Sequence, residues 1–132
     1  LIFTASANRR FSPRATLAGV LSREESQSSM LGSNYYVANA ATATFTHKIA
    51  KPLFWSLGLA YQNNSYSADS TSAAANFARR DDDLIGVRVG AGYYFRERLS
   101  FRVNYDYTDR KSSIAGFDFS KNLYLFEIQA GW

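Results

Sequence analysis

Apolar and polar side chains alternate along several stretches of this chain, and this two-residue period limits what the chain can fold into. The pattern is clearest in Arg98–Arg110, where every second side chain from Leu99 to Tyr107 is apolar or aromatic and those between are polar. Successive side chains of a β-strand point to opposite faces of a sheet. The alternation therefore predicts strands with one apolar and one polar face.

Seven such segments follow one another, and the connections between them are tight and long in turn. The segments are expected at about Leu1–Arg10, Arg14–Glu24, Asn34–Lys48, Leu53–Asn64, Asp83–Arg96, Arg98–Arg110 and Lys121–Trp132. The tight connections are 11–13, 49–52 and 96–98, and the long ones are 25–33, 65–82 and 111–120. Short turns at one rim and long polar loops at the other are typical of transmembrane β-barrels. We therefore expect an all-β fold, an antiparallel up-and-down barrel.

The faces can be assigned in some segments and not in others. Leu53–Asn64 and Asp83–Arg96 repeat the two faces seen in Arg98–Arg110. In Arg14–Glu24 and Asn34–Lys48 apolar and polar residues share a face, so their orientation stays open.

Composition excludes several classes of protein. With 132 residues, 46% of them hydrophobic and 16% aromatic, the chain is not a disordered tail. No apolar run approaches the roughly 20 residues that a membrane-spanning helix needs. The absence of cysteine rules out a disulfide framework. The formal net charge of +4 is spread along the chain, so it does not indicate a nucleic-acid partner.

Aromatic residues on the apolar faces lie mostly near strand ends. They are Trp55, Tyr61, Phe95, Tyr107 and Trp132. Aromatic girdles at both membrane interfaces are a feature of transmembrane barrels. Ordinary strand composition is the alternative, because aromatic residues are favoured in any sheet. The bias toward strand ends favours a girdle in contact with a lipid bilayer.

The chain ends on a strand whose last residue is aromatic. Its apolar positions are Tyr124, Phe126, Ile128, Ala130 and Trp132. This ending resembles the signal read by the bacterial outer-membrane assembly machinery, and it implies that machinery as a partner and the outer membrane as the location. With this terminus in the periplasm, all tight turns fall on the periplasmic side and all long loops on the outer side.

A soluble barrel such as a lipocalin-like carrier has the same periodicity with the faces reversed. The apolar faces carry too many large aromatic side chains to fit inside a narrow barrel. The polar faces carry the glycines Gly86, Gly90, Gly92 and Gly131. Small residues there suit the crowded inside of a curved sheet. These features favour the membrane barrel.

Seven strands are an odd number for a single-chain bacterial barrel, which has an even number. We expect at least one ascending strand upstream, so that residues 1–132 form the carboxy-terminal part of one transmembrane β-barrel domain. The start at Leu1, without Met or a leader, is expected to reflect removal of a segment. Total strand number would separate a side-chain-filled barrel from an aqueous channel.

Charged residues on the polar faces are the candidate lining of the lumen. They are Arg88, Arg96, Arg102, Asp106, Arg110 and Glu127. They could form a mildly cationic selectivity lining. They could equally form a structural network, because unpaired charge inside a narrow barrel is costly. Both interpretations stay open.

Catalysis, metals and cofactors are not expected. Outer-membrane enzymes resemble one another in placing their catalytic histidine near the outer rim. The single histidine here, His47, lies beside the turn 49–52, which is expected at the periplasmic rim. Asp81, Asp82 and Asp83 match no calcium-loop spacing, and a solvated loop end is the expected place for them. No catalytic, cofactor-binding or metal-binding residue is proposed.

Turns such as Arg10–Arg14 and Tyr94–Arg98, together with the Tyr105-Asp106-Tyr107 motif, carry a family resemblance. The chain resembles the outer-membrane β-barrel porins associated with exopolysaccharide and capsule secretion. That resemblance implies transport of polysaccharide or small solutes through a porin or export channel, and it transfers no binding residues. A structural or interaction barrel, with a plugged polar interior and partner-binding surface loops, is the alternative. The oligomeric state stays open.

Overall fold

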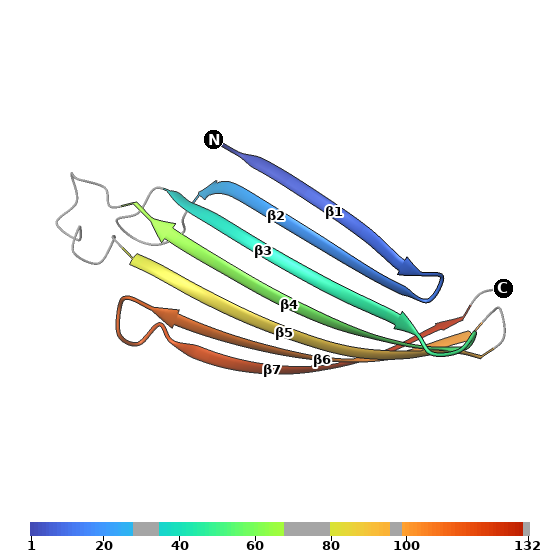
Figure 1. Cartoon of the computed structure of the whole chain (residues 1–132). Helices are drawn as coiled ribbons and strands as arrows, with labels where there is room; N and C mark the ends of the chain where they lie inside the picture. The colour runs from blue at the N-terminus through green and yellow to red at the C-terminus, as the bar shows by residue number, and fades with distance from the viewer. Residues whose placement is uncertain (28–34, 68–79, 96–98, 131–132) are drawn as a thin grey trace.

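The chain forms one sheet of seven antiparallel strands, arranged in the order of the sequence (Figure 1). A computed structural model describes residues 1–27, 35–67, 80–95 and 99–130. The strands are β1 (Phe3–Ser12), β2 (Ala15–Gln27), β3 (Tyr35–Lys48), β4 (Leu53–Tyr66), β5 (Arg80–Phe95), β6 (Leu99–Ser112) and β7 (Phe119–Ala130). The prediction of seven antiparallel strands is confirmed. No helix able to cross a membrane is found in these ranges.

Several strands extend further into the polar segments than the sequence predicts. The long connection expected at 65–82 is wrong at both ends, since β4 continues to Tyr66 and β5 begins at Arg80. β2 and β6 likewise run on to Gln27 and Ser112. Alternation of apolar and polar residues stops where the apolar residues stop, but the backbone ladder continues beyond them. Strand length was therefore underestimated.

The register of the strands aligns the apolar positions into one continuous face, which we call the apolar face. One row of direct cross-strand neighbours runs through Leu17, Phe45, Leu57, Val89, Tyr105 and Tyr124, from β2 to β7. Because side chains alternate strictly, the opposite face holds the remaining residues and is called the polar face. The sheet therefore has two chemically different surfaces.

The register also settles the two strands whose faces the sequence left open. Val20 lies on the polar face of β2, whereas Asn39 lies on the apolar side of β3, directly opposite Arg23. The Arg23 guanidinium donates a 3.2 Å hydrogen bond to Asn39 Oδ1. Both residues lie toward the loop end of the sheet, which is the end where β4 finishes and β5 begins, beyond the last apolar row. Polar residues on the apolar side thus mark where the apolar band ends.

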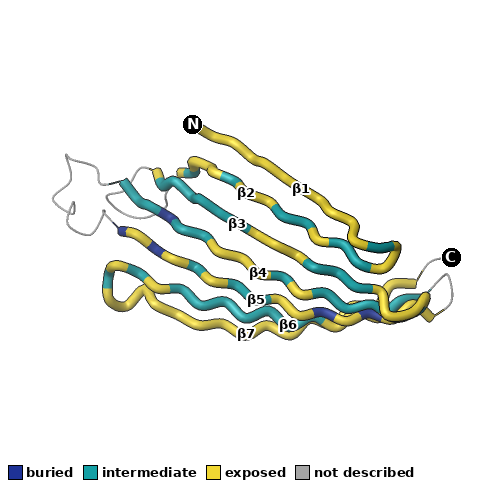
Figure 2. The backbone as a smooth tube through the Cα atoms, in the orientation of Figure 1, coloured by how far each residue is buried: buried dark blue, intermediate teal, exposed yellow. Residues whose placement is uncertain are grey.

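Burial is the reverse of that in a soluble domain (Figure 2). Among the described residues, those that are buried are Asn64, Arg80, Asp82, Gly90 and Gly92, all on the polar face. Large apolar residues of the other face stay exposed, with Phe126 at 77%. Side chains crowd together on the concave side of a curved sheet and spread apart on the convex side. The polar face is therefore the inner side of the curve, opposite to a lipocalin-like arrangement.

β1 and β7 are the two edges of this single layer. A sheet of one layer has no second layer against which to bury its apolar face. The open sheet is consistent with part of a larger β-barrel.

Phe54 and Gly92 form a tight contact on the polar face, where they are direct neighbours on β4 and β5. The contact lies near the turn end of the sheet, which is the end where β4 begins and β5 finishes. A Cβ atom built on Gly92 would overlap the Phe54 ring. That ring packs against Tyr94 at 5.3 Å between centroids, and the Arg102 guanidinium lies 5.5 Å from its centre. The glycine gives the ring its place.

Replacing Gly92 by Ala should destabilise the folded protein by about 1–3 kcal/mol, because the Phe54 ring must leave Tyr94 and Arg102. Urea unfolding of the full-length protein in detergent, followed by tryptophan fluorescence, measures the change. Gly19→Ala is the matched control, since a Cβ there would meet only the Thr42 carbonyl oxygen, at 3.7 Å. Equal unfolding midpoints for the two variants would contradict the contact.

Candidate functional site

The polar face is the candidate site, because every ion pair found among the described residues lies on it. Its charged groups lie in three places along the strands. One is the turn end, where β4 begins and β5 finishes, the second is the middle, and the third is the loop end, where β4 finishes and β5 begins. Antiparallel pairing brings together residues far apart in sequence. Each group is held by side chains from neighbouring strands.

Arg88 on β5 and Asp106 on β6 form the ion pair in the middle of the polar face. They are direct register partners. The guanidinium binds both carboxylate oxygens, with Nε to Oδ1 at 2.5 Å and Nη2 to Oδ2 at 2.9 Å. The Arg88 side chain is 65% exposed, whereas Asp106 is 15% exposed. A two-pronged pair of this kind fixes the guanidinium plane.

Arg102 and Glu127 form a second pair, at the turn end. They are register partners on β6 and β7, and Arg102 Nη1 lies 3.8 Å from Glu127 Oε2. The distance is too long for a direct hydrogen bond, and both side chains are about half exposed. Such a pair contributes little to stability in water. It leaves Arg102 free to stack on Phe54.

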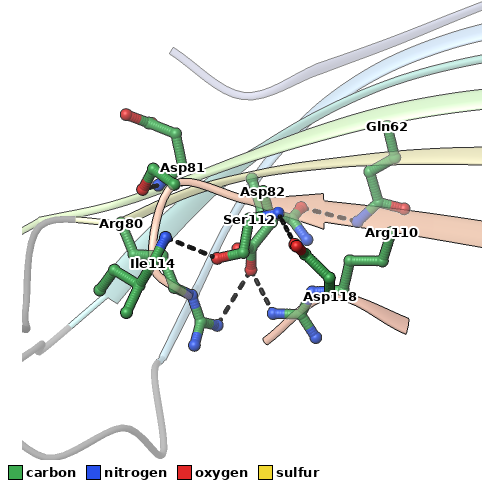
Figure 3. Close-up of polar contacts among 10 residues, drawn as sticks. Gln62, Arg80, Asp81, Asp82, Arg110, Ser112, Ile114 and Asp118 are labelled. Carbon is green, nitrogen blue, oxygen red and sulfur yellow. Dashed lines mark hydrogen bonds and ion pairs between the residues drawn. The ribbon is translucent and has the colours of Figure 1, made fainter. Parts of the chain in front are cut away.

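Asp82 is the centre of a third group, at the loop end (Figure 3). Its Oδ2 forms an ion pair with Arg80 Nη2 at 3.0 Å and accepts a hydrogen bond from Arg110 Nη2. Asp82 is fully buried, so the expectation that Asp81–Asp83 forms a solvated loop end is wrong for this residue. Two arginines surround the carboxylate and compensate for the loss of solvent.

The segment between β6 and β7 packs over this group. The Arg80 guanidinium lies 4.2 Å from the centre of the Tyr66 ring and 4.6 Å from that of Phe117. The Asp118 carboxylate accepts a 2.6 Å hydrogen bond from the Ser112 backbone amide, which holds the segment in place. Within the described residues, three buried polar atoms lack a hydrogen-bond partner: Asp82 Oδ1, Arg80 Nε and Arg110 Nε.

The predicted lumen-lining residues that the structure describes all lie on the polar face. Arg88 pairs with Asp106, Arg102 with Glu127, and Arg110 with Asp82. Arg96 lies outside the described residues. Asp82 and Arg80 are not among the predicted lining residues, although both lie on the same face of β5 as Arg88. Their even spacing from Arg88 could have placed them on its face. The neighbouring charged residues made the segment resemble a loop.

The predicted girdle residues lie near the two borders of the apolar band. Trp55 packs near the turn end against Phe45 and His47, at 5.5 and 6.1 Å between ring centres. Near the loop end, the Tyr61 hydroxyl donates a 2.7 Å hydrogen bond to Asp83 Oδ1. The other girdle residues that are described lie on the same face, namely Phe95 and Tyr107. Trp132 lies outside the described residues.

The predicted assembly signal lies on the outermost strand of the apolar face. Tyr124, Phe126 and Ile128 are all exposed there. Tyr105 supports the first of them, with ring centres 5.0 Å apart. His47 has aromatic neighbours on this same face, away from the charged groups of the polar face.

Replacing Asp82 by Asn should destabilise the protein by about 3 kcal/mol, because two arginines, one of them nearly fully buried, lose their counter-charge. The urea midpoint of the full-length protein in detergent measures the loss. Asp81→Asn, at the exposed neighbouring position, is the control and should change stability by less than about 0.5 kcal/mol. Similar midpoints for both variants would refute the stabilising role of Asp82.

A known protein family matches this chain. No curated protein and no solved structure gave a significant match. A sequence model of the family described as "Putative beta-barrel porin 2" matches residues 1–130. The seven-stranded antiparallel sheet agrees with a porin-like barrel wall. The chain belongs to the family described as "Putative beta-barrel porin 2".

Proposed function

We propose that this chain is part of a bacterial outer-membrane channel, with its apolar face toward lipid and its polar face toward the lumen. The continuous apolar band is the observation that carries the proposal. On β5 the band runs from Ile85 to Phe95, close to the roughly 9–11 residues that a tilted transmembrane strand needs. Beyond it, the same side of β5 continues as Asp83 and Asp81, as expected where a strand leaves lipid.

The proposal places the short turns in the periplasm and the loop end outside. The lipid bilayer and the outer-membrane assembly machinery are its partners, with Tyr124, Phe126 and Ile128 contributing to the recognised strand. Their exposure on the apolar face at the edge of the sheet supports this role. No catalytic step is assigned to the chain.

Charge on the polar face supports a channel with a mild preference for anions. In the described strands, the basic side chains of the polar face are Arg10, Lys48, Arg80, Arg88, Arg102, Arg110 and Lys121, and the acidic ones are Glu24, Asp82, Asp106 and Glu127. The basic groups outnumber the acidic ones, so positive charge remains after the ion pairs are counted. An excess of positive charge along a pore attracts anionic solutes. Small polar solutes or polysaccharide are the proposed cargo.

One observation favours a second candidate, a barrel closed by its own side chains. At the loop end, Phe117 and Tyr66 cover Arg80, and Asp82 is fully buried. If the rest of the barrel were filled in the same way, the protein would serve as a structural or interaction barrel. The middle of the polar face, where Arg88 is exposed, favours the channel.

Conductance of the full-length protein in planar lipid bilayers tests the channel. We expect open steps that pass chloride better than potassium. Arg102→Ser should lower that preference by about two-fold, because exposed charges interact by less than about 1 kcal/mol. Lys111→Ser is the control, since it removes the same charge from the opposite side of β6.

Absence of conductance from correctly folded protein would refute the channel and favour the closed barrel. Equal selectivity changes for Arg102→Ser and Lys111→Ser would refute the assignment of the polar face to the lumen.

A further inference from the structure

A hollow lies in the middle of the polar face and crosses the strands from β3 to β7. Its volume is about 440 Å³, within the range of roughly 300–1,000 Å³ typical of small-molecule sites. Its polar side chains include Arg88, Asp106, Thr108 and Lys121, and Gly58 and Gly86 form its floor.

Small residues create this hollow, and bulky ones bound it on both sides. A Cβ atom on Gly58 would already touch Arg88 Cβ at 3.4 Å, and one on Gly86 would touch Ala60 Cβ at 3.4 Å. Toward the turn end the face is filled by Phe54, and toward the loop end by the group around Asp82. The middle is thus the recessed part of the described wall.

Polar groups of the hollow are available to a ligand. Asp106 binds Arg88 Nε and Nη2, and no other described residue bonds to Nη1 of this exposed guanidinium. In the part of the chain that the structure describes, no hydrogen bond or ion pair engages the Lys121 ammonium. The same holds there for the side-chain hydroxyls of the lining threonines, Thr42, Thr44 and Thr108.

The combination of charges and hydroxyls selects a class of ligand. Arg88 and Lys121 together with Asp106 leave one excess positive charge in the hollow. That excess matches a singly charged carboxylate better than a doubly charged phosphate. Threonine hydroxyls, which both donate and accept, match the hydroxyl groups of a sugar.

We propose that the hollow is a binding subsite for a sugar acid, with its carboxylate at Lys121 and Arg88 Nη1 and its hydroxyls at Thr108, the register partner of Lys121. This inference rests on the proposed function, in which the polar face lines a passage. The ligand could be a free sugar acid or one unit of an acidic polysaccharide. The two sources share the carboxylated sugar ring that the hollow recognises.

Saturation-transfer NMR on the full-length protein in detergent tests the subsite without requiring conductance. D-glucuronate should bind measurably better than D-glucose. Lys121→Gln should weaken glucuronate binding about three- to five-fold, the value of one exposed ion pair. Lys48→Gln is the control, because it removes the same charge from the same face outside the hollow, and it should leave binding unchanged.

Equal binding of glucose and glucuronate would overturn the subsite, as would equal losses for Lys121→Gln and Lys48→Gln. Glucuronate binding by a protein without conductance would support the subsite and refute the channel, whereas conductance without preferential binding would do the reverse. A galacturonate trimer separates the two sources once the subsite holds. Tighter binding of the trimer than of galacturonate indicates a polymer, and equal binding indicates single sugar acids.

Discussion

Backbone hydrogen bonds between neighbouring strands hold this sheet together, because a single layer has no second layer against which to pack. A slip of one residue between two strands would turn every side chain of one strand to the other face. The register observed from β2 to β7 contains no such slip, and it aligns Leu17, Phe45, Leu57 and Val89 in one row. The irregularity between Arg10 and Ser12 lies in edge strand β1, next to the first turn. The separation into two faces depends on this ladder.

The polar face shows how side-chain size and charge are distributed once the ladder is fixed. Phe54 at one end and the group around Asp82 at the other fill the concave side. Glycines on β4 and β5 leave the middle recessed, and the Arg88–Asp106 pair crosses it. Ion pairs between register partners hold charge inside the curve at a lower cost than isolated charges. The same wall can therefore be stable and still offer polar groups to a solute.

Much of the fold could be predicted from alternation alone. The described parts of the segments Leu53–Asn64, Asp83–Arg96 and Arg98–Arg110 have the predicted faces, and the candidate lining residues Arg102 and Glu127 lie opposite one another. The faces of β2 and β3 could not be assigned, because Val20 and Asn39 break the pattern. Asp82 was misplaced because an aspartate beside other polar residues resembles a loop, and only β6 supplies the Arg110 that allows its burial.

The sequence by itself determined the strand number, the antiparallel class and the chemical character of most faces, because the two-residue period is a local property of the chain. Only the tertiary structure decided which charges meet, where the strands end, and which part of the polar face is recessed. Those properties depend on contacts between residues on different strands. Arg88 and Asp106 are 18 positions apart in sequence, and pairing in register brings their side chains into contact.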